Sequence, residues 1–122
     1  MMGDYRKLQV WERSHKLTLE VYSATKAFPK EEMYRLTDQP CRAASSIPAN
    51  IAEGCGRNGD AEFARFLDIA KGSATELDYH LILARDLGYL PTSYYELLAS
   101  EVDAVSRMIS ALAAQLRKTR RS

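Results

Sequence analysis

The chain has little of the side-chain chemistry that most enzymes use. Its 122 residues include only two histidines and two cysteines. It contains no Walker loop, nucleophile elbow, Cys-x-x-Cys pair or dinucleotide fingerprint. The spacing of the sequence groups no acid, base and nucleophile together. We therefore expect a protein that is not an enzyme and that holds no cofactor.

One short motif is similar to a metal-ligand pair. Glu12 and His15 stand three positions apart, as in the Glu-x-x-His pairs of di-iron helical bundles. A di-iron site needs a second such pair on another helix. The only other histidine, His80, has Leu77 three positions before it, so we expect no metal site.

The chain also lacks a strong charge of one sign and a long apolar run. Lysine and arginine total 17 and aspartate and glutamate total 16, which gives a net charge of +1. No apolar run approaches the ~20 residues of a membrane span, and the first seven residues lack the apolar core of a signal peptide. We expect a cytoplasmic protein that does not enter the membrane.

Positive charge gathers at the C-terminus. No acidic residue follows Asp103, and the segment 117–122 carries Arg117, Lys118, Arg120 and Arg121. Two interpretations stay open. The tail is either a solubilising end that suits the negative end of a helix dipole, or a site that binds phosphate groups.

Apolar residues recur in alternating steps of three and four along four successive segments, which is typical of amphipathic helices. The segments cover residues 10–28, 33–55, 63–84 and 98–116. Pro29 and Gly88 are expected to end the first and third helices, and Gly54 and Gly56 to end the second in a left-handed cap.

The starts of the last two helices also carry signals. Asn58 or Asp60 is expected to cap the third helix, and Ser93 with Glu96 forms a capping box for the fourth. No strand pattern competes, and the turns are short. The sequence therefore predicts an all-α fold, an antiparallel up-down-up-down four-helix bundle, as one domain over residues 1–122.

The second helix contains a proline at an internal position. Pro48 has no N–H for the carbonyl of Ala44, at a cost of roughly 3 kcal/mol in an unassisted helix. We expect a kink there. We also expect Asn50 and Glu53 to bond to exposed backbone or to groups on the third helix.

Polar residues form a second stripe on each of the two middle helices. The residues are Gln39, Arg42, Ser46, Asn50, Glu53 and Arg57 on the second helix, and Arg65, Asp68, Gly72, Glu76 and Tyr79 on the third. One interpretation is two solvent faces with ion pairs inside each helix. The other is that the stripes meet across a subunit boundary, where Gly72 lets a helix approach closely.

Several short motifs occur in a fixed order. They are Tyr5 to Trp11, Phe28-Pro29 with Glu32, Gln39 with Arg42 to Ala44, Ser46 to Gly54, Glu62-Phe63, and Ala70 to Leu77. Over residues 5–116 the chain resembles the bacterial four-helix bundle family of 23S rRNA intervening-sequence proteins. That family is similar to the accessory variability determinant of diversity-generating retroelements.

The resemblance implies a barrel-shaped homopentamer, because those relatives form one. It also implies partners, since the retroelement member binds nucleic acid and a reverse transcriptase. We expect a nucleic-acid-binding or adaptor protein for RNA or DNA; the alternative is a protein-interaction scaffold, for example for a reverse transcriptase, without direct nucleic-acid binding. Pro40 and Cys41 depart from the family pattern, so the second helix is expected to bend or to begin later. The near-neutral charge points to weaker nucleic-acid binding than the family name suggests.

The basic residues near both termini are the predicted nucleic-acid site. In an up-down-up-down bundle the two termini lie at the same end, so the basic side chains share one rim. Binding there would be electrostatic and without strong base specificity. The residues are Arg6, Lys7, Arg117, Lys118, Arg120 and Arg121.

Overall fold

The computed structural model describes the backbone of residues 3–121 and the side chains of residues 3–119. This part of the chain holds four long α-helices and no strand, as the apolar stripes predict. The helices are α1 (Gln9–Thr25), α2 (Asp38–Cys55), α3 (Asp60–Asp86) and α4 (Thr92–Arg121). Three short helical turns, η1 (Tyr5–Lys7), η2 (Lys30–Glu32) and η3 (Met33–Thr37), complete it.

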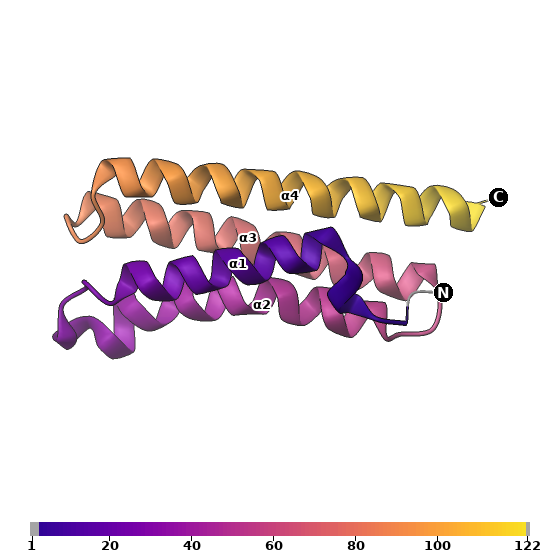
Figure 1. Cartoon of the computed structure of the whole chain (residues 1–122), viewed down its shortest axis with the longest axis horizontal. Helices are drawn as coiled ribbons and strands as arrows, with labels where there is room; N and C mark the ends of the chain where they lie inside the picture. Colours follow the sequence, from indigo (N-terminus) through magenta and orange to yellow (C-terminus); the bar gives the residue numbers. More distant parts are fainter. Residues whose placement is uncertain (1–2, 122) are drawn as a thin grey trace.

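The four helices lie side by side along one axis (Figure 1). Turns join consecutive helices at alternate ends of the bundle, and both ends of the chain lie at the same end. Each of α1 and α3 contacts both α2 and α4, so the apolar faces enclose one core. Across residues 3–121, no helix combines the length and the apolar character that a bilayer crossing requires.

Small residues let α2 and α3 pack closely. Ala44 on α2 and Ala70 and Ala74 on α3 are completely buried. At Gly54, an added Cβ would lie 2.6 Å from the Cβ of Phe66 and 3.0 Å from Cδ1 of Phe63. Gly54 is therefore a packing residue inside α2, because only glycine leaves room for α3 at this point.

The expected left-handed cap at Gly54 and Gly56 is wrong. The helix continues through Gly54 to Cys55, and Gly56 has an ordinary φ of −87°. Among the described residues, positive φ occurs at Gly59 (92°) and Gly88 (84°). The first of these turns the chain into α3, and the second follows the end of α3 as predicted.

The two expected N-caps are also wrong. Gly59 precedes α3 and its carbonyl accepts from the N–H of Phe63, so Asp60 is the first helical residue and Asn58 lies in the turn. α4 begins at Thr92, and the N–H of Tyr95 donates to the carbonyl of Pro91. Ser93 therefore lies inside the first turn of α4. These are the first regular i→i−4 bonds of the two helices, and the residues that precede the helices, Gly59 and Pro91, have no capping side chain.

The start of the second helix confirms the effect expected of Pro40. The segment from Met33 to Thr37 is a π-helix, and α2 proper begins at Asp38. Pro40 has no N–H to give to the carbonyl of Leu36, four residues earlier, so regular α-helical bonding cannot run unbroken through this point. The wider π turn stands where that bond is missing.

The carbonyl of Ala44, which Pro48 leaves without a donor, has a partner on α1. Oγ1 of Thr18 lies 3.0 Å from this carbonyl oxygen and 2.8 Å from the carbonyl oxygen of Ser14. Thr18 is only 7% exposed. One buried hydroxyl therefore connects α1 to the interrupted point of α2, and neither Asn50 nor Glu53 makes this bond.

We predict that Gly54→Ala destabilises the fold by about 1–3 kcal/mol, because the new methyl group overlaps Phe66. Urea denaturation followed by circular dichroism measures the effect. The control is Gly56→Ala, where the nearest atom to an added Cβ is 3.7 Å away. Equal midpoints for the two variants would show that α3 does not need the glycine.

We predict that Thr18→Val costs about 1–3 kcal/mol, because it keeps the shape of the side chain but removes the donor to Ala44. In a Pro48→Ala background the helix regains its own N–H for that carbonyl, so the same substitution should cost less. A double-mutant cycle in urea measures the difference. Equal costs in the two backgrounds would contradict this role of Thr18.

Candidate nucleic-acid and subunit interfaces

The predicted basic residues come from the two termini, which Figure 1 places at the same end of the bundle. Arg6 and Lys7 belong to η1, and Arg117 and Lys118 belong to the last turns of α4. All four side chains are exposed. The side chains of Arg120 and Arg121 lie outside the described residues, although the backbone of both belongs to α4.

Two of these arginines are already paired with carboxylates. Nε of Arg6 lies 3.0 Å from Oδ1 of Asp4, and hydrogen bonds from Arg6 lower the pKa of that carboxyl. Arg117 pairs with Asp68 on α3. Both pairs are solvent-exposed and therefore weak. A phosphate group at this end would have to compete with these two carboxylates.

The polar stripes of α2 and α3 meet within one chain. Oγ of Ser46 lies 2.8 Å from Oγ of Ser73. Nδ2 of Asn50 donates to the backbone carbonyl of Ser46 at 2.8 Å and to its hydroxyl at 3.0 Å. Asn50 thus bonds to the part-buried Ser46 of its own helix and not to the carbonyl that Pro48 leaves without a donor. Ser73 is not among the predicted stripe residues, because it lies one position outside the stripe, next to the buried Ala74.

Several other stripe residues make ion pairs with residues three or four positions away in the sequence. Arg57 lies 2.7 Å from Glu53, and Arg42 lies 3.5 Å from Asp38. The expectation that Glu53 bonds to α3 or to exposed backbone is therefore wrong, because its charged partner Arg57 lies four positions later, just beyond the end of α2. Within one chain, these residues therefore fit the interpretation that the stripes are solvent faces with local ion pairs.

Gly72 has open space around it. No described atom lies within 4 Å of an added Cβ, so no helix of the same chain approaches it. Gly72 is exposed and lies next to Ser73, the α3 residue that meets Ser46 of α2. A close approach at Gly72 would therefore have to come from a second chain.

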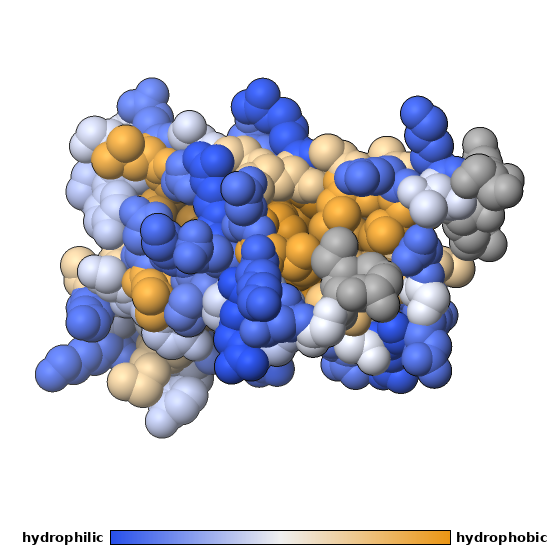
Figure 2. All heavy atoms as spheres, turned by 45° about the vertical axis from the view of Figure 1, so that its right-hand side comes forward, coloured by the Kyte–Doolittle hydropathy of each residue, from blue (hydrophilic) through white to orange (hydrophobic). Residues whose placement is uncertain are grey.

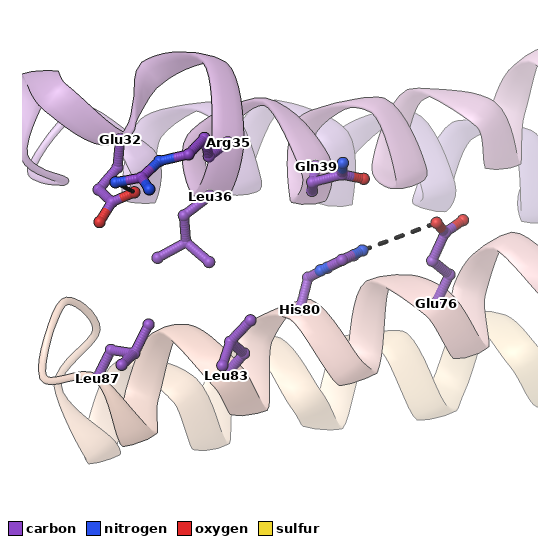
Figure 3. Close-up of a pocket in the computed structure, with 8 residues that line it drawn as sticks. All are labelled: Glu32, Arg35, Leu36, Gln39, Glu76, His80, Leu83 and Leu87. Carbon is purple, nitrogen blue, oxygen red and sulfur yellow. Dashed lines mark ion pairs between the residues drawn. The ribbon is translucent and has the colours of Figure 1, made fainter.

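Gln39 and Glu76 lie at a cavity of about 420 Å³ between the start of α2 and the end of α3, which we name the α2–α3 pocket (Figure 3). Oε2 of Glu76 is 3.7 Å from Nε2 of His80. The other ring nitrogen, Nδ1, is buried and has no hydrogen-bond partner among the described residues. The pocket is lined by Glu32, Arg35, Leu36, Gln39, Glu76, His80, Leu83 and Leu87.

A second cavity, of about 460 Å³, lies between α1 and α2 and has an aromatic wall. The Trp11 and His15 rings are stacked with centroids 5.1 Å apart, and Tyr5 meets Trp11 edge-on. Leu19 is 56% exposed and Tyr22 is 48% exposed. We name this surface the α1–α2 groove. Trp11, His15, Leu19 and Tyr22 follow helical spacing, and that second stripe on α1 was the signal for it.

Apolar residues also gather at the surface near the termini. Figure 2 shows hydrophilic residues over much of the face it displays, with apolar residues in a hollow toward the end where the termini lie. The surface is thus not uniformly polar, even though charged residues make up 27% of the chain. Exposed apolar surface of this kind is typical of contact sites.

The sequence model of the family described as 23S rRNA-intervening sequence protein matches residues 6–111. The chain belongs to this family. The resemblance drawn from the short motifs is thereby confirmed for most of the chain. No curated protein matches it.

The fold of this family member has a counterpart in a solved structure. A crystal structure at 1.70 Å shows a protein of unknown function from the S23 ribosomal protein family of Bacteroides thetaiotaomicron VPI-5482. The TM-score is 0.79 at 23% sequence identity, and the similarity covers 85% of this chain and 97% of the other. At this identity the likeness shows a shared fold.

We predict that Asn50→Ala destabilises the chain by about 1 kcal/mol, because Asn50 holds the Ser46 hydroxyl that meets Ser73. Ser73→Ala should then cost less in the Asn50→Ala background than in the natural chain. Urea midpoints of the two single variants and the double variant test this coupling. Strictly additive costs would show that the three side chains do not act as one network.

Proposed function

We propose that this protein is a non-enzymatic homopentamer of antiparallel bundles that binds RNA or DNA through its basic ends. The observation that carries the proposal is the placement of both termini at one end of the bundle. In a cyclic assembly every subunit presents that end on the same side, so the basic residues of all subunits gather on one rim. Membership of the intervening-sequence family supports this reading.

The surface offers two different faces for a ring contact. The α1–α2 groove exposes Leu19 and Tyr22, and the α2–α3 seam carries polar side chains and the open Gly72. A closed ring is built from a heterologous contact, in which one face of each subunit meets a different face of the next. The polar seam then lies at or near the subunit boundary.

Binding in this proposal is electrostatic and depends on the assembly. Arg6 and Arg117 are each shared with a carboxylate, so a single subunit attracts phosphate weakly. Several weak contacts held on one rim reinforce one another, because the second and later contacts form at a high effective concentration. No base-reading element is needed for this kind of binding.

The second candidate function is a scaffold for a partner protein, without direct contact to nucleic acid. The aromatic wall of the α1–α2 groove and the exposed Leu19 favour it, because such surfaces suit protein partners. The likeness of the family to the accessory variability determinant of retroelements suggests a reverse transcriptase as the partner.

Truncation after Leu116 tests the function. We predict that it weakens binding to a structured RNA at least tenfold at about 0.1 M salt and flattens the salt dependence, because phosphate contacts are lost. Sedimentation should give five chains for both the full and the truncated protein. Unchanged affinity and salt slope would exclude the tail as the site, and a monomer mass at micromolar concentration would exclude the ring.

The substitution Asp68→Asn tests the role of Arg117 in RNA binding more directly. It removes the carboxylate that holds Arg117 and should therefore increase RNA affinity. Asp103→Asn is the matched control, because it makes the same change of charge but releases Arg107 in the middle of α4. Equal effects of the two substitutions would show that only net charge matters and that Arg117 is not a specific contact, and no effect of either would favour the scaffold function.

A further inference from the structure

We propose that a pocket beside the turn between α1 and α2 binds a small molecule with an apolar body and one carboxylate group. The pocket holds about 490 Å³, which is within the range of small-molecule sites. It lies at the opposite end of the bundle from the termini (Figure 1), so the inference goes beyond the proposed nucleic-acid function. We name it the turn pocket. Its lining includes Lys26, Phe28, Pro29, Lys30, Met33 and Cys41.

Apolar side chains form much of the wall of the turn pocket. Phe28 is buried, and its ring packs against Tyr89 with the two centroids 5.9 Å apart. Met33 is 49% exposed and Pro29 is half-buried. A ligand body that covers Met33 and Pro29 would remove apolar surface from water, which is favourable. The body is therefore an aromatic ring or a short alkyl chain.

The two buried polar residues of the lining, Thr25 and Cys41, are already bonded. Oγ1 of Thr25 lies 3.4 Å from Sγ of Cys41 and 3.0 Å from the carbonyl oxygen of Tyr22. Burial raises the pKa of the Cys41 thiol, so the thiol is uncharged at neutral pH and does not repel an anion. An apolar ligand body thus leaves neither of these two groups without a partner.

Two lysines supply the charge that selects the head group. Lys26, directly after α1, and Lys30, in η2, both line the turn pocket and are exposed. Neither forms an ion pair in the part of the chain that the structure describes. The acidic residue of the lining, Asp38, lies 3.5 Å from Arg42. A carboxylate on the ligand would therefore be attracted by two cations that no described carboxylate holds. One negative charge suits the site better than two, because Asp38 repels the second.

The backbone at the turn pocket has an unusual form. Met33 and Thr37, which both line the pocket, are the first and last residues of the π-helix. This turn stands where Pro40 interrupts regular helical bonding. π turns occur frequently at functional sites. The irregular turn therefore supports a binding role for this end of the bundle.

Two probes with the same apolar body test the proposal, namely 4-phenylbutyrate and 4-phenyl-1-butanol, in which a hydroxyl replaces the carboxylate. Isothermal titration of the full-length protein at about 20 mM salt should show the acid binding roughly fivefold more tightly than the alcohol, the ratio expected for two exposed ion pairs. At about 0.5 M salt the ratio should approach one, because salt screens exposed charges.

Paired substitutions locate the site. In Lys26→Met with Lys30→Met the acid and the alcohol should bind equally, because both cations of the pocket are removed while apolar stems remain. The matched control is Lys16→Met with Lys71→Met, which makes the same change of net charge outside the lining, so the fivefold ratio should remain. Met33→Gln should weaken both probes to the same degree, since it makes part of the apolar wall polar.

Equal binding of the two probes to the natural protein at low salt would overturn the proposal, and so would no binding of the acid at millimolar concentration. A fivefold ratio that persists without both pocket lysines would place the anion elsewhere on the chain and would overturn the proposal as well. All four substituted lysines are exposed, so we expect the variants to fold like the natural protein, and circular dichroism checks this.

Discussion

The carbonyl of Ala44 is the point on which the arrangement of α2 depends. Pro48 removes the donor that this carbonyl would have in a regular helix, and the Thr18 hydroxyl on α1 lies 3.0 Å from it. A buried carbonyl without a partner is costly, so α1 must lie at this position along α2. Six residues after Pro48, Gly54 fixes the position of α3 on the other side of α2, because Phe66 of α3 leaves no room for a Cβ at Gly54. Two irregular residues on one helix thus set the positions of both its neighbours.

A second proline on the same helix shapes the surface. Pro40 lies in the first turn of α2, and the π-helix before it carries Leu36 and Arg35. The α2–α3 pocket opens at this place, whereas the buried small residues Ala44, Ala70 and Ala74 bring the two helices together further along the seam. The interruption at Pro40 and the close packing at Gly54 therefore give the two ends of one seam different characters. One end is open and the other is closed.

Periodicity predicts the four helices because burial of an apolar stripe requires it, whatever the partner is. The consequence of Pro40 is predicted instead from its departure from the family pattern, because proline has no N–H to donate. Periodicity does not predict the N-caps, since α3 and α4 follow Gly59 and Pro91, which have no capping side chain. Periodicity also does not predict contacts between residues that are far apart in the sequence. Arg13 on α1 makes two hydrogen bonds to Glu101, 88 positions away, and nothing in the local pattern of either helix marks that pair.

The same limit applies to the candidate sites. Sequence places basic residues at both termini, but only the fold brings Asp68 against Arg117. An exposed ion pair is weak, so a phosphate can replace the carboxylate at little cost, and the gain for each subunit is correspondingly small. The exchange is also screened by salt. A rim of several subunits would make such an exchange effective without any change in the individual contacts. For a chain with a net charge of +1, assembly is therefore the physical route by which weak basic ends could hold a nucleic acid.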